Sequence, residues 1–193
     1  MLKKIAIISG AILILLLIGL AFLGAFQSTD VKSEVEGGYK LMGIYHRGPY
    51  EKIGEAFGKV GDAARKLGWK DSITREMTSK DRLTFGVYFD DPSSKPKDSL
   101  LSFAAIQIFN SADSIAVCRL LKDAKFFEIP KGNALVCDQK TSGMLSMVIA
   151  AMRAYPALGR YAKAHEPKEP VTHVFEVYHP GRTRFVMLSE SID

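Results

Sequence analysis

The sequence predicts an α+β protein in which a strand–helix–strand–strand unit occurs twice, preceded by one transmembrane helix. Two short apolar and aromatic segments echo each other, FGVYFDDP at residues 85–92 and FEVYHP at residues 175–180. An amphipathic helical pattern precedes each of them along the chain. A third segment, residues 5–26, is a run of 22 residues without a charged side chain. Two such units pack naturally as an antiparallel sheet with helices on one face.

The uncharged run at residues 5–26 is long enough for a membrane anchor. A helix of this length spans about 33 Å, which exceeds the hydrocarbon core of a bilayer. A cleaved signal peptide has a shorter apolar region of about 7–15 residues, and the bulky Phe22 and Phe26 do not suit its cleavage site. We therefore expect an uncleaved anchor at residues 5–26 that follows a short tail at residues 1–4.

Charges that flank the anchor predict its orientation. Lys3 and Lys4 precede the run, and within ten residues after it the basic residue is Lys32. Because basic residues are retained on the cytoplasmic side, we expect a single-pass protein with a cytoplasmic N-terminus and an extracytoplasmic domain. The opposite orientation stays open.

After the anchor, a polar linker at residues 27–37 leads into one domain at residues 38–193. From residue 5 onward, 24 basic residues stand against 21 acidic ones and form no long basic run. Nucleic-acid binding is therefore not indicated. Cys118 and Cys137 are too few for a disulfide framework or a cysteine metal site; whether they pair depends on the compartment.

Hydrophobic periodicity and turn residues divide the domain into elements. In the first unit we expect a strand at residues 39–46, an amphipathic helix at 53–67 with Gly68 as its C-cap, and two strands at 72–78 and 83–90. The connection holds a strand at 100–109, a helix at 111–121 capped by Ser111 or Asp113, and a short strand at 126–129. In the second unit we expect a strand at 133–139, a helix at 141–165 capped by Thr141 and kinked or split at Pro156, and two strands at 171–178 and 183–188.

Alternation along the echo strands places their residues on two faces. Phe85, Val87, Phe175 and Val177 share one face, which we expect the helices to cover. Glycine 86, tyrosines 88 and 178 and glutamate 176 share the other face. If the units pair about a pseudo-twofold axis, this second face lines a cleft with space, aromatic walls and one negative charge. Such a cleft suits an amphipathic or cationic small molecule. The alternative is that glutamate 176 lies exposed on an open sheet.

The sequence offers no strong signal for a metal or cofactor. His173, Glu176 and His179 have a metal-like spacing, but on a strand both histidines point away from the glutamate. The chain also contains no nucleophile elbow, phosphate loop or dinucleotide fingerprint. We therefore expect neither a metal site nor a cofactor.

Three motifs resemble the GyrI-like small-molecule-binding family, whose members include effector-binding domains. The motifs are YHRGPY at residues 45–50, GVYFDDP at 86–92 and FEVY at 175–178. A helix segment, RAYPALGRY at 153–161, is similar to the membrane-anchored branch that includes the testis-expressed reticulophagy receptor. The resemblance implies a duplicated fold whose cleft glutamate meets cationic ligands. The candidate ligand-binding residues are Glu176, Tyr178, Tyr88, Gly86 and Tyr45.

Three functions compete at this stage. The first is a membrane-anchored binding module for a small amphipathic or cationic molecule. The second is a hydrolase of small electrophilic molecules with Glu176 as general base, which some relatives suggest. The third is a membrane scaffold whose cleft is filled by its own side chains. We rank binding above catalysis because the sequence shows one candidate carboxylate and no clear nucleophile. It names neither the ligand nor a protein partner.

Overall fold

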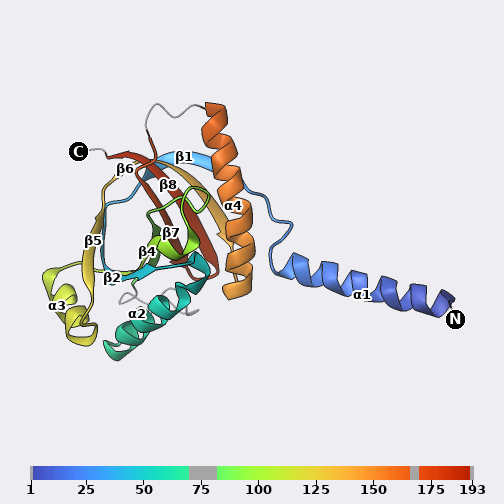
Figure 1. Ribbon diagram of the computed structural model, residues 1–193, viewed down its shortest axis with the longest axis horizontal. Helices are drawn as coiled ribbons and strands as arrows, with labels where there is room; N and C mark the ends of the chain where they lie inside the picture. The colour runs from blue at the N-terminus through green and yellow to red at the C-terminus, as the bar shows by residue number, and fades with distance from the viewer. Residues whose placement is uncertain (1, 70–81, 166–169, 192–193) are drawn as a thin grey trace.

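The computed structural model describes residues 2–69, 82–165 and 170–191, and shows an α+β body from which one helix projects (Figure 1). The projecting helix is α1 (Leu2–Phe22). Within the described residues it is the one helix that is long and apolar enough to cross a membrane, by length and composition. The predicted strand at residues 72–78 lies outside the described residues.

The body is built on an antiparallel sheet of eight described strands in the order β1-β6-β8-β7-β3-β4-β2-β5. The strands are β1 (Val31–Glu36), β2 (Tyr39–Arg47), β3 (Thr84–Tyr88), β4 (Leu101–Gln107), β5 (Lys125–Ile129), β6 (Gly132–Lys140), β7 (His173–His179) and β8 (Arg182–Ser191). The helices of the body are α2 (Gly54–Lys66), α3 (Ser111–Leu120) and α4 (Met144–His165), with single 3-10 turns at Tyr50–Lys52 and Lys97–Ser99. The two predicted units thus occupy the two halves of one sheet.

The echo strands β3 and β7 are neighbours at the centre of the sheet, where the two units meet. They pair antiparallel, and Gly86 lies directly opposite Glu176 in the register. On either side of this pair, Phe85 lies opposite Val177 and Val87 opposite Phe175. The pseudo-twofold axis that the repeat predicts therefore passes beside the Gly86–Glu176 pair.

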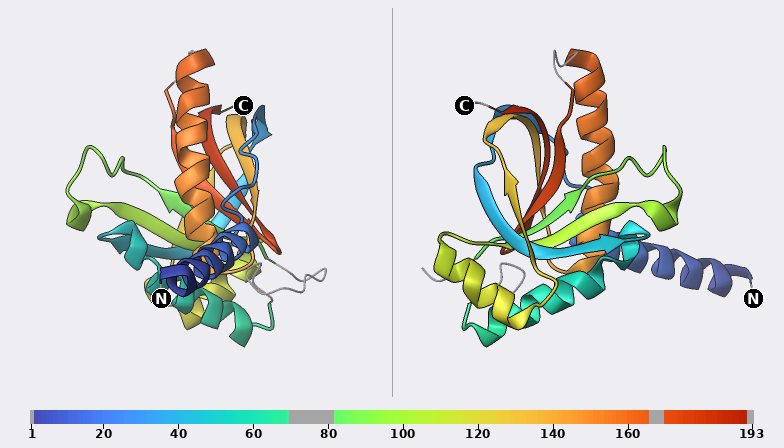
Figure 2. Two further views of the ribbon diagram at one scale, coloured as in Figure 1. Left: turned by 90° about the vertical axis from the view of Figure 1, so that its right-hand side faces the viewer. Right: turned by 60° about the vertical axis from the view of Figure 1, so that its left-hand side comes forward.

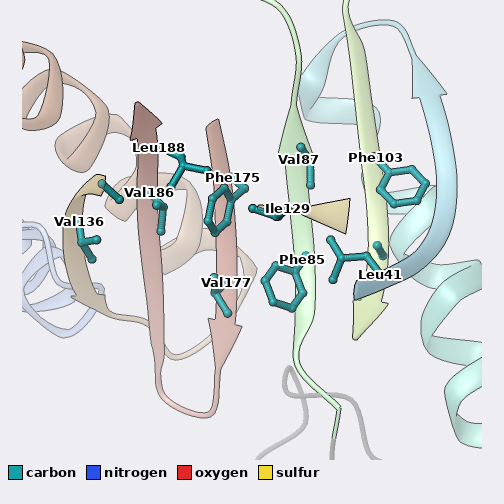
Figure 3. Close-up of a cluster of buried hydrophobic side chains, with 12 residues drawn as sticks. Leu41, Phe85, Val87, Phe103, Ile129, Val136, Phe175, Val177, Val186 and Leu188 are labelled. Atoms are coloured by element: carbon teal, nitrogen blue, oxygen red, sulfur yellow. The ribbon is translucent and has the colours of Figure 1, made fainter. Parts of the chain in front are cut away.

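The Phe/Val face of the echo strands forms the main core, but helices do not cover it. The sheet curls, so that this face packs against side chains from its own outer strands, including Ile129 of β5 and Val136 of β6 (Figure 2, right; Figure 3). The Tyr39 ring lies 4.8 Å from the Phe85 ring. Strand twist and curl thus bury an apolar face that the sequence analysis assigned to the helices.

The helices cover the Gly86 and Glu176 face instead, which corrects that expectation. Helix α2 packs Ala56, Val60 and Ala64 into a cluster with Met42 and Ile106 of the sheet, a cluster that α3 also joins. Helix α4 packs Ala150, Ala154 and Leu158 against Cys137 and Phe185. Small residues on both helices allow a close approach to the sheet. The helices therefore lie on one face, as predicted, but on the face that carries Glu176.

Several local expectations change. The predicted linker at 27–37 contains β1, which pairs with β6 along its whole length. The cap of α3 is Asn110, whose side chain accepts from the Asp113 amide. Thr141 bonds Thr183 and does not cap α4. Pro156 lies inside a continuous helix, where the hydrogen bond that it removes falls on the outward side.

Strand β1 is held by an ionic network around Arg184 of β8. The Arg184 guanidinium contacts Glu34 Oε1 at 2.8 Å, Glu36 Oε2 at 2.6 Å and Asp138 Oδ2 at 2.9 Å. Hydrogen bonds to Asp138 and Glu36 raise the pKa of Arg184 above its ordinary value. The network joins β1, β6 and β8, so a polar segment forms an ordered edge strand.

Replacing Arg184 with Ala should destabilise the fold, because the buried Glu36 loses its cationic partner. We expect a loss of about 2–4 kcal/mol in the free energy of unfolding, near the range for breaking a buried ion pair. The exposed Arg182 on the same strand is the control, and Arg182→Ala should change stability by less than about 0.5 kcal/mol. Urea unfolding of the full chain in detergent measures both, and equal losses would contradict the role of the network.

Candidate functional site

Glu176 lies in the middle of β7, and its residue surface is 7% exposed. Three tyrosine hydroxyls donate hydrogen bonds to its carboxylate: Tyr155 of α4 to Oε1 at 2.7 Å, Tyr88 of β3 to Oε2 at 3.2 Å and Tyr178 of β7 to Oε2. These four residues form the Glu176 cluster. A helix of the second unit and a strand of each unit therefore converge on one carboxylate.

The electrostatics of the cluster are set by burial. Removal from water raises the pKa of Glu176, and the hydrogen bonds from Tyr178, Tyr155 and Tyr88 offset part of that rise. Burial, together with the nearby carboxylate, raises the pKa of each tyrosine well above its ordinary value. In the described part of the chain, the groups that hydrogen-bond Glu176 are neutral hydroxyls, so its charge is solvated by dipoles and not balanced by a cation.

Gly86 makes room for this arrangement. A methyl group at this position would lie 3.0 Å from Tyr88 Oη and 3.3 Å from Tyr178 Oη and Phe57 Cζ. Phe57 comes from α2, and its ring meets the Tyr178 ring edge-on at 5.4 Å. The aromatic wall therefore includes Phe57 of α2 as well as Tyr155 of α4. Phe57 packs over Gly86, which has no side chain.

Tyr50 extends the wall on the side of Tyr88. Its ring lies 4.9 Å from the Tyr88 ring, and its hydroxyl donates to the Asp90 carbonyl at 2.7 Å. The Asp90 amide in turn donates to the Tyr50 hydroxyl at 3.1 Å. This hydrogen-bonded pair holds the residue that follows the Gly-Pro motif against the cluster.

The structure brings together four of the five predicted ligand-binding residues: Gly86, Tyr88, Glu176 and Tyr178. Tyr45 lies elsewhere, because its ring contacts Phe103 at 4.7 Å and Phe89 at 5.8 Å on the opposite face of the sheet. The burial of Glu176 also excludes the alternative of an open sheet surface. His173, one of the two histidines that flank it, lies on the opposite face, where its ring packs on Phe127 at 5.9 Å.

Sequence reasoning missed three residues of the site, Tyr50, Phe57 and Tyr155. A signal was present for two of them, because Phe57 and Tyr155 occupy inward positions of the predicted helices. Their connection to Glu176 required knowing that the helices cover the Glu176 face. Tyr50 belongs to the same motif as Tyr45, but it follows the turn at Gly48, whose φ of 134° redirects the chain.

A cavity of about 490 Å³ borders the cluster at Tyr178. Its wall combines the segment before α4, the turn between β7 and β8, and the end of α1, including Thr141, Met147, His179 and Phe22. The Glu176 cluster itself is closed by its own side chains. Tyr178 therefore separates the carboxylate from the hollow.

Comparison with known proteins supports the fold at low sequence identity. No protein-family model and no curated protein matches the sequence. An integron cassette protein from the mobile metagenome of Vibrio cholerae matches with 13% identity, TM-score 0.54 and coverage of 83% of this chain and 95% of that one. The EcmrR C-terminal domain matches with 13% identity, TM-score 0.53 and coverage of 85% and 99%.

A third solved structure, SAV2435 bound to tetraphenylphosphonium, matches with 12% identity, TM-score 0.51 and coverage of 83% of this chain and 94% of that one. At 12–13% identity these matches establish the fold alone.

The burial of Glu176 predicts a pH-dependent stability difference between the protein and its Glu176→Gln variant. A carboxyl whose pKa is higher in the folded state binds more protons there than in the unfolded chain, so stability falls as pH rises from the ordinary value of 4.5 through the folded pKa. Glutamine lacks this titration. We expect the melting temperature of the variant, relative to the wild type, to increase across that range. Thermal unfolding in a pH series tests this, and a difference that does not change with pH would contradict the burial of an ionisable Glu176.

The space at Gly86 gives a second prediction. Gly86→Ala should cost about 1–3 kcal/mol, because the added methyl group overpacks the tyrosine hydroxyls. Gly58 in α2 has no atom within 4 Å of its added methyl position, so Gly58→Ala should instead stabilise by about 0.5–1 kcal/mol through helix propensity. Chemical denaturation of both variants measures the contrast, and a neutral Gly86→Ala variant would show that the cluster does not need this space.

Proposed function

We propose that the protein is a membrane-anchored binding protein that takes a small lipophilic organic cation at Glu176. The observation that carries the proposal is a buried carboxylate whose hydrogen-bond partners are three tyrosine hydroxyls. Hydroxyl dipoles reduce the cost of burying a charge but do not neutralise it. A cation that displaces part of this shell would supply the missing opposite charge.

The aromatic wall adds selectivity for cations with an apolar surface. Tyr50, Phe57 and the cluster tyrosines present ring faces and edges around the carboxylate, and ring faces attract cations within about 6 Å. A strongly hydrated ion such as an ammonium would have to lose its water to enter. A delocalised or alkyl- or aryl-shielded cation loses little hydration, so it suits this site better. The ligand in SAV2435, tetraphenylphosphonium, belongs to this class.

Ligand entry requires the cluster to open. The cavity beside Tyr178 has a volume in the range of small-molecule sites. Rotation of the Tyr178 ring away from Glu176 would join this hollow to the carboxylate. The Tyr88 hydroxyl is the other group that a ligand would displace easily. Its hydrogen bond to Glu176, at 3.2 Å, is longer than that of Tyr155, at 2.7 Å.

The membrane part of the proposal is supported by α1. Its apolar side chains are broadly exposed, for example Ile7 at 71% and Leu15 at 67%, as expected for a helix whose natural surroundings are lipid. The flanking lysines support a cytoplasmic N-terminus, so we place the binding domain on the extracytoplasmic side. Membership of the membrane-anchored GyrI-like branch is part of the same proposal.

One observation favours the hydrolase as a second candidate. Burial raises the pKa of Glu176, which is the direction that favours a general base. However, the three tyrosine hydroxyls of the Glu176 cluster donate to the carboxylate and have raised pKa values, so these three are not activated nucleophiles. Water-dependent turnover of an electrophile would need the same opening of the cluster. Binding requires fewer steps, and we rank it first.

Tetraphenylphosphonium binding tests the proposal with matched charges. We expect the cation to raise the melting temperature of the full chain in detergent, and the isosteric anion tetraphenylborate to leave it unchanged. Glu176→Gln should weaken cation binding at least about tenfold, equivalent to about 1.4 kcal/mol. Glu36→Gln is the control, because Glu36 is also buried and also bonded by a tyrosine hydroxyl, that of Tyr39, but is paired with Arg184. It should bind the cation like the wild type.

Equal stabilisation by the cation and the anion would indicate binding to apolar surface without charge recognition. Retention of cation binding by Glu176→Gln, or an equal loss in Glu36→Gln, would contradict the assignment of Glu176. Turnover of an ester or epoxide that Glu176→Gln abolishes would favour the hydrolase.

A further inference from the structure

The outward side of α4 is apolar where a surface helix is ordinarily polar. Leu145, Val148 and Met152 are 60%, 52% and 72% exposed, and Pro156 continues the same line. These four residues follow one another at spacings of three or four, so they form one stripe along the helix. We call them the α4 stripe. An exposed apolar stripe of this kind marks a surface that contacts another apolar phase.

The segment that follows α1 is attached to the end of β6 and to α4. Gln27 and Lys140 exchange two hydrogen bonds, from Gln27 Nε2 to the Lys140 carbonyl at 3.2 Å and from the Lys140 amide to Gln27 Oε1 at 2.9 Å. The Arg153 guanidinium, from the middle of α4, donates to the Gly24 carbonyl. Gln27 and Lys140 also line the cavity beside Tyr178. The chain that leaves α1 is therefore held against β6 and α4.

The arrangement of the two helices places α4 between the sheet and the membrane. Helix α1 projects from the side of the body that α4 covers, and α4 runs across the direction of α1 (Figure 1). Seen along α1, α4 lies in front of the sheet (Figure 2, left). A bilayer crossed by α1 would consequently face the outward side of α4, which carries the α4 stripe.

Basic residues continue this side of the helix toward its C-terminal end. Arg160 and Lys163 are exposed, and they lie one to two turns beyond Pro156. An apolar stripe followed by basic residues is typical of helices that lie in a membrane interface, where the apolar part enters the acyl boundary and the charges meet anionic headgroups.

We propose that α4 lies on the bilayer surface, with the α4 stripe in the interface and Arg160 and Lys163 at anionic headgroups. This inference rests on the proposed anchoring by α1 and is independent of the ligand at Glu176. It gives the domain a fixed orientation on the membrane. The same helix carries Tyr155, so a membrane contact and a hydrogen bond to Glu176 belong to one rigid element.

Depth-dependent quenching tests the proposal in the full chain. An environment-sensitive fluorophore is attached to Met152→Cys in a Cys118→Ser background, since Cys118 is exposed and Cys137 is buried. The chain is reconstituted into vesicles of phosphatidylcholine and phosphatidylglycerol that contain a spin-labelled lipid. The control is Ile115→Cys on α3, another exposed apolar position, at 54% against 72% for Met152. We expect several-fold stronger quenching at position 152 than at position 115.

Neutralisation of the basic end completes the test. In vesicles with phosphatidylglycerol, Arg160→Gln with Lys163→Gln should reduce quenching at position 152, and in pure phosphatidylcholine it should have little effect. Chains that float with the vesicles but show equal quenching at 152 and 115 would overturn the inference, and chains that do not float would overturn both it and the anchor. Loss of tetraphenylphosphonium binding with quenching intact would instead reject the ligand assignment alone.

Discussion

The buried carboxylate of Glu176 is the constraint on which the rest of the structure depends. A charge in the centre of a sheet is unfavourable unless polar groups surround it, and here Tyr88, Tyr155 and Tyr178 supply them. Their convergence requires an empty position opposite the glutamate, which Gly86 provides. It also requires a helix close enough to bring Tyr155 to the sheet, which the alanines of α4 allow. The packing of the domain thus surrounds the Glu176 carboxylate with hydroxyl dipoles but does not neutralise its charge.

Duplication explains why this site is single. The echo strands meet on the pseudo-twofold axis, where both units contribute the same position of the repeat. Two glutamates there would face each other and repel, so that one would stay protonated. Two glycines would leave no charge. A glycine in one unit and a glutamate in the other give one carboxylate with room beside it, and similar tyrosines from both strands complete the walls.

Sequence reasoning found the repeat, the shared face of Gly86, Tyr88, Glu176 and Tyr178, and the antiparallel sheet. It assigned the helices to the wrong face, because the Phe/Val face and the Gly/Tyr face are both apolar enough to be covered. Which one the helices take depends on curl of the sheet, a property of long-range strand pairing. The same limit hid Tyr155 and Phe57. Strand β1 was missed because VKSEVE is polar; its order depends on Arg184, which is about 150 residues away in the chain.

We propose that the chain is anchored in a membrane, that the outward side of α4 contacts the bilayer, and that the buried carboxylate binds a cation. In this proposal, ionisation of Glu176 and cation binding are coupled. The most direct measurement is the side-chain carboxyl 13C chemical shift of Glu176, assigned with Glu176→Gln and titrated with and without tetraphenylphosphonium. We predict a pKa above the ordinary glutamate range in the free protein and a lower pKa when the cation is bound. A titration of Glu176 that the cation leaves unchanged would contradict the account.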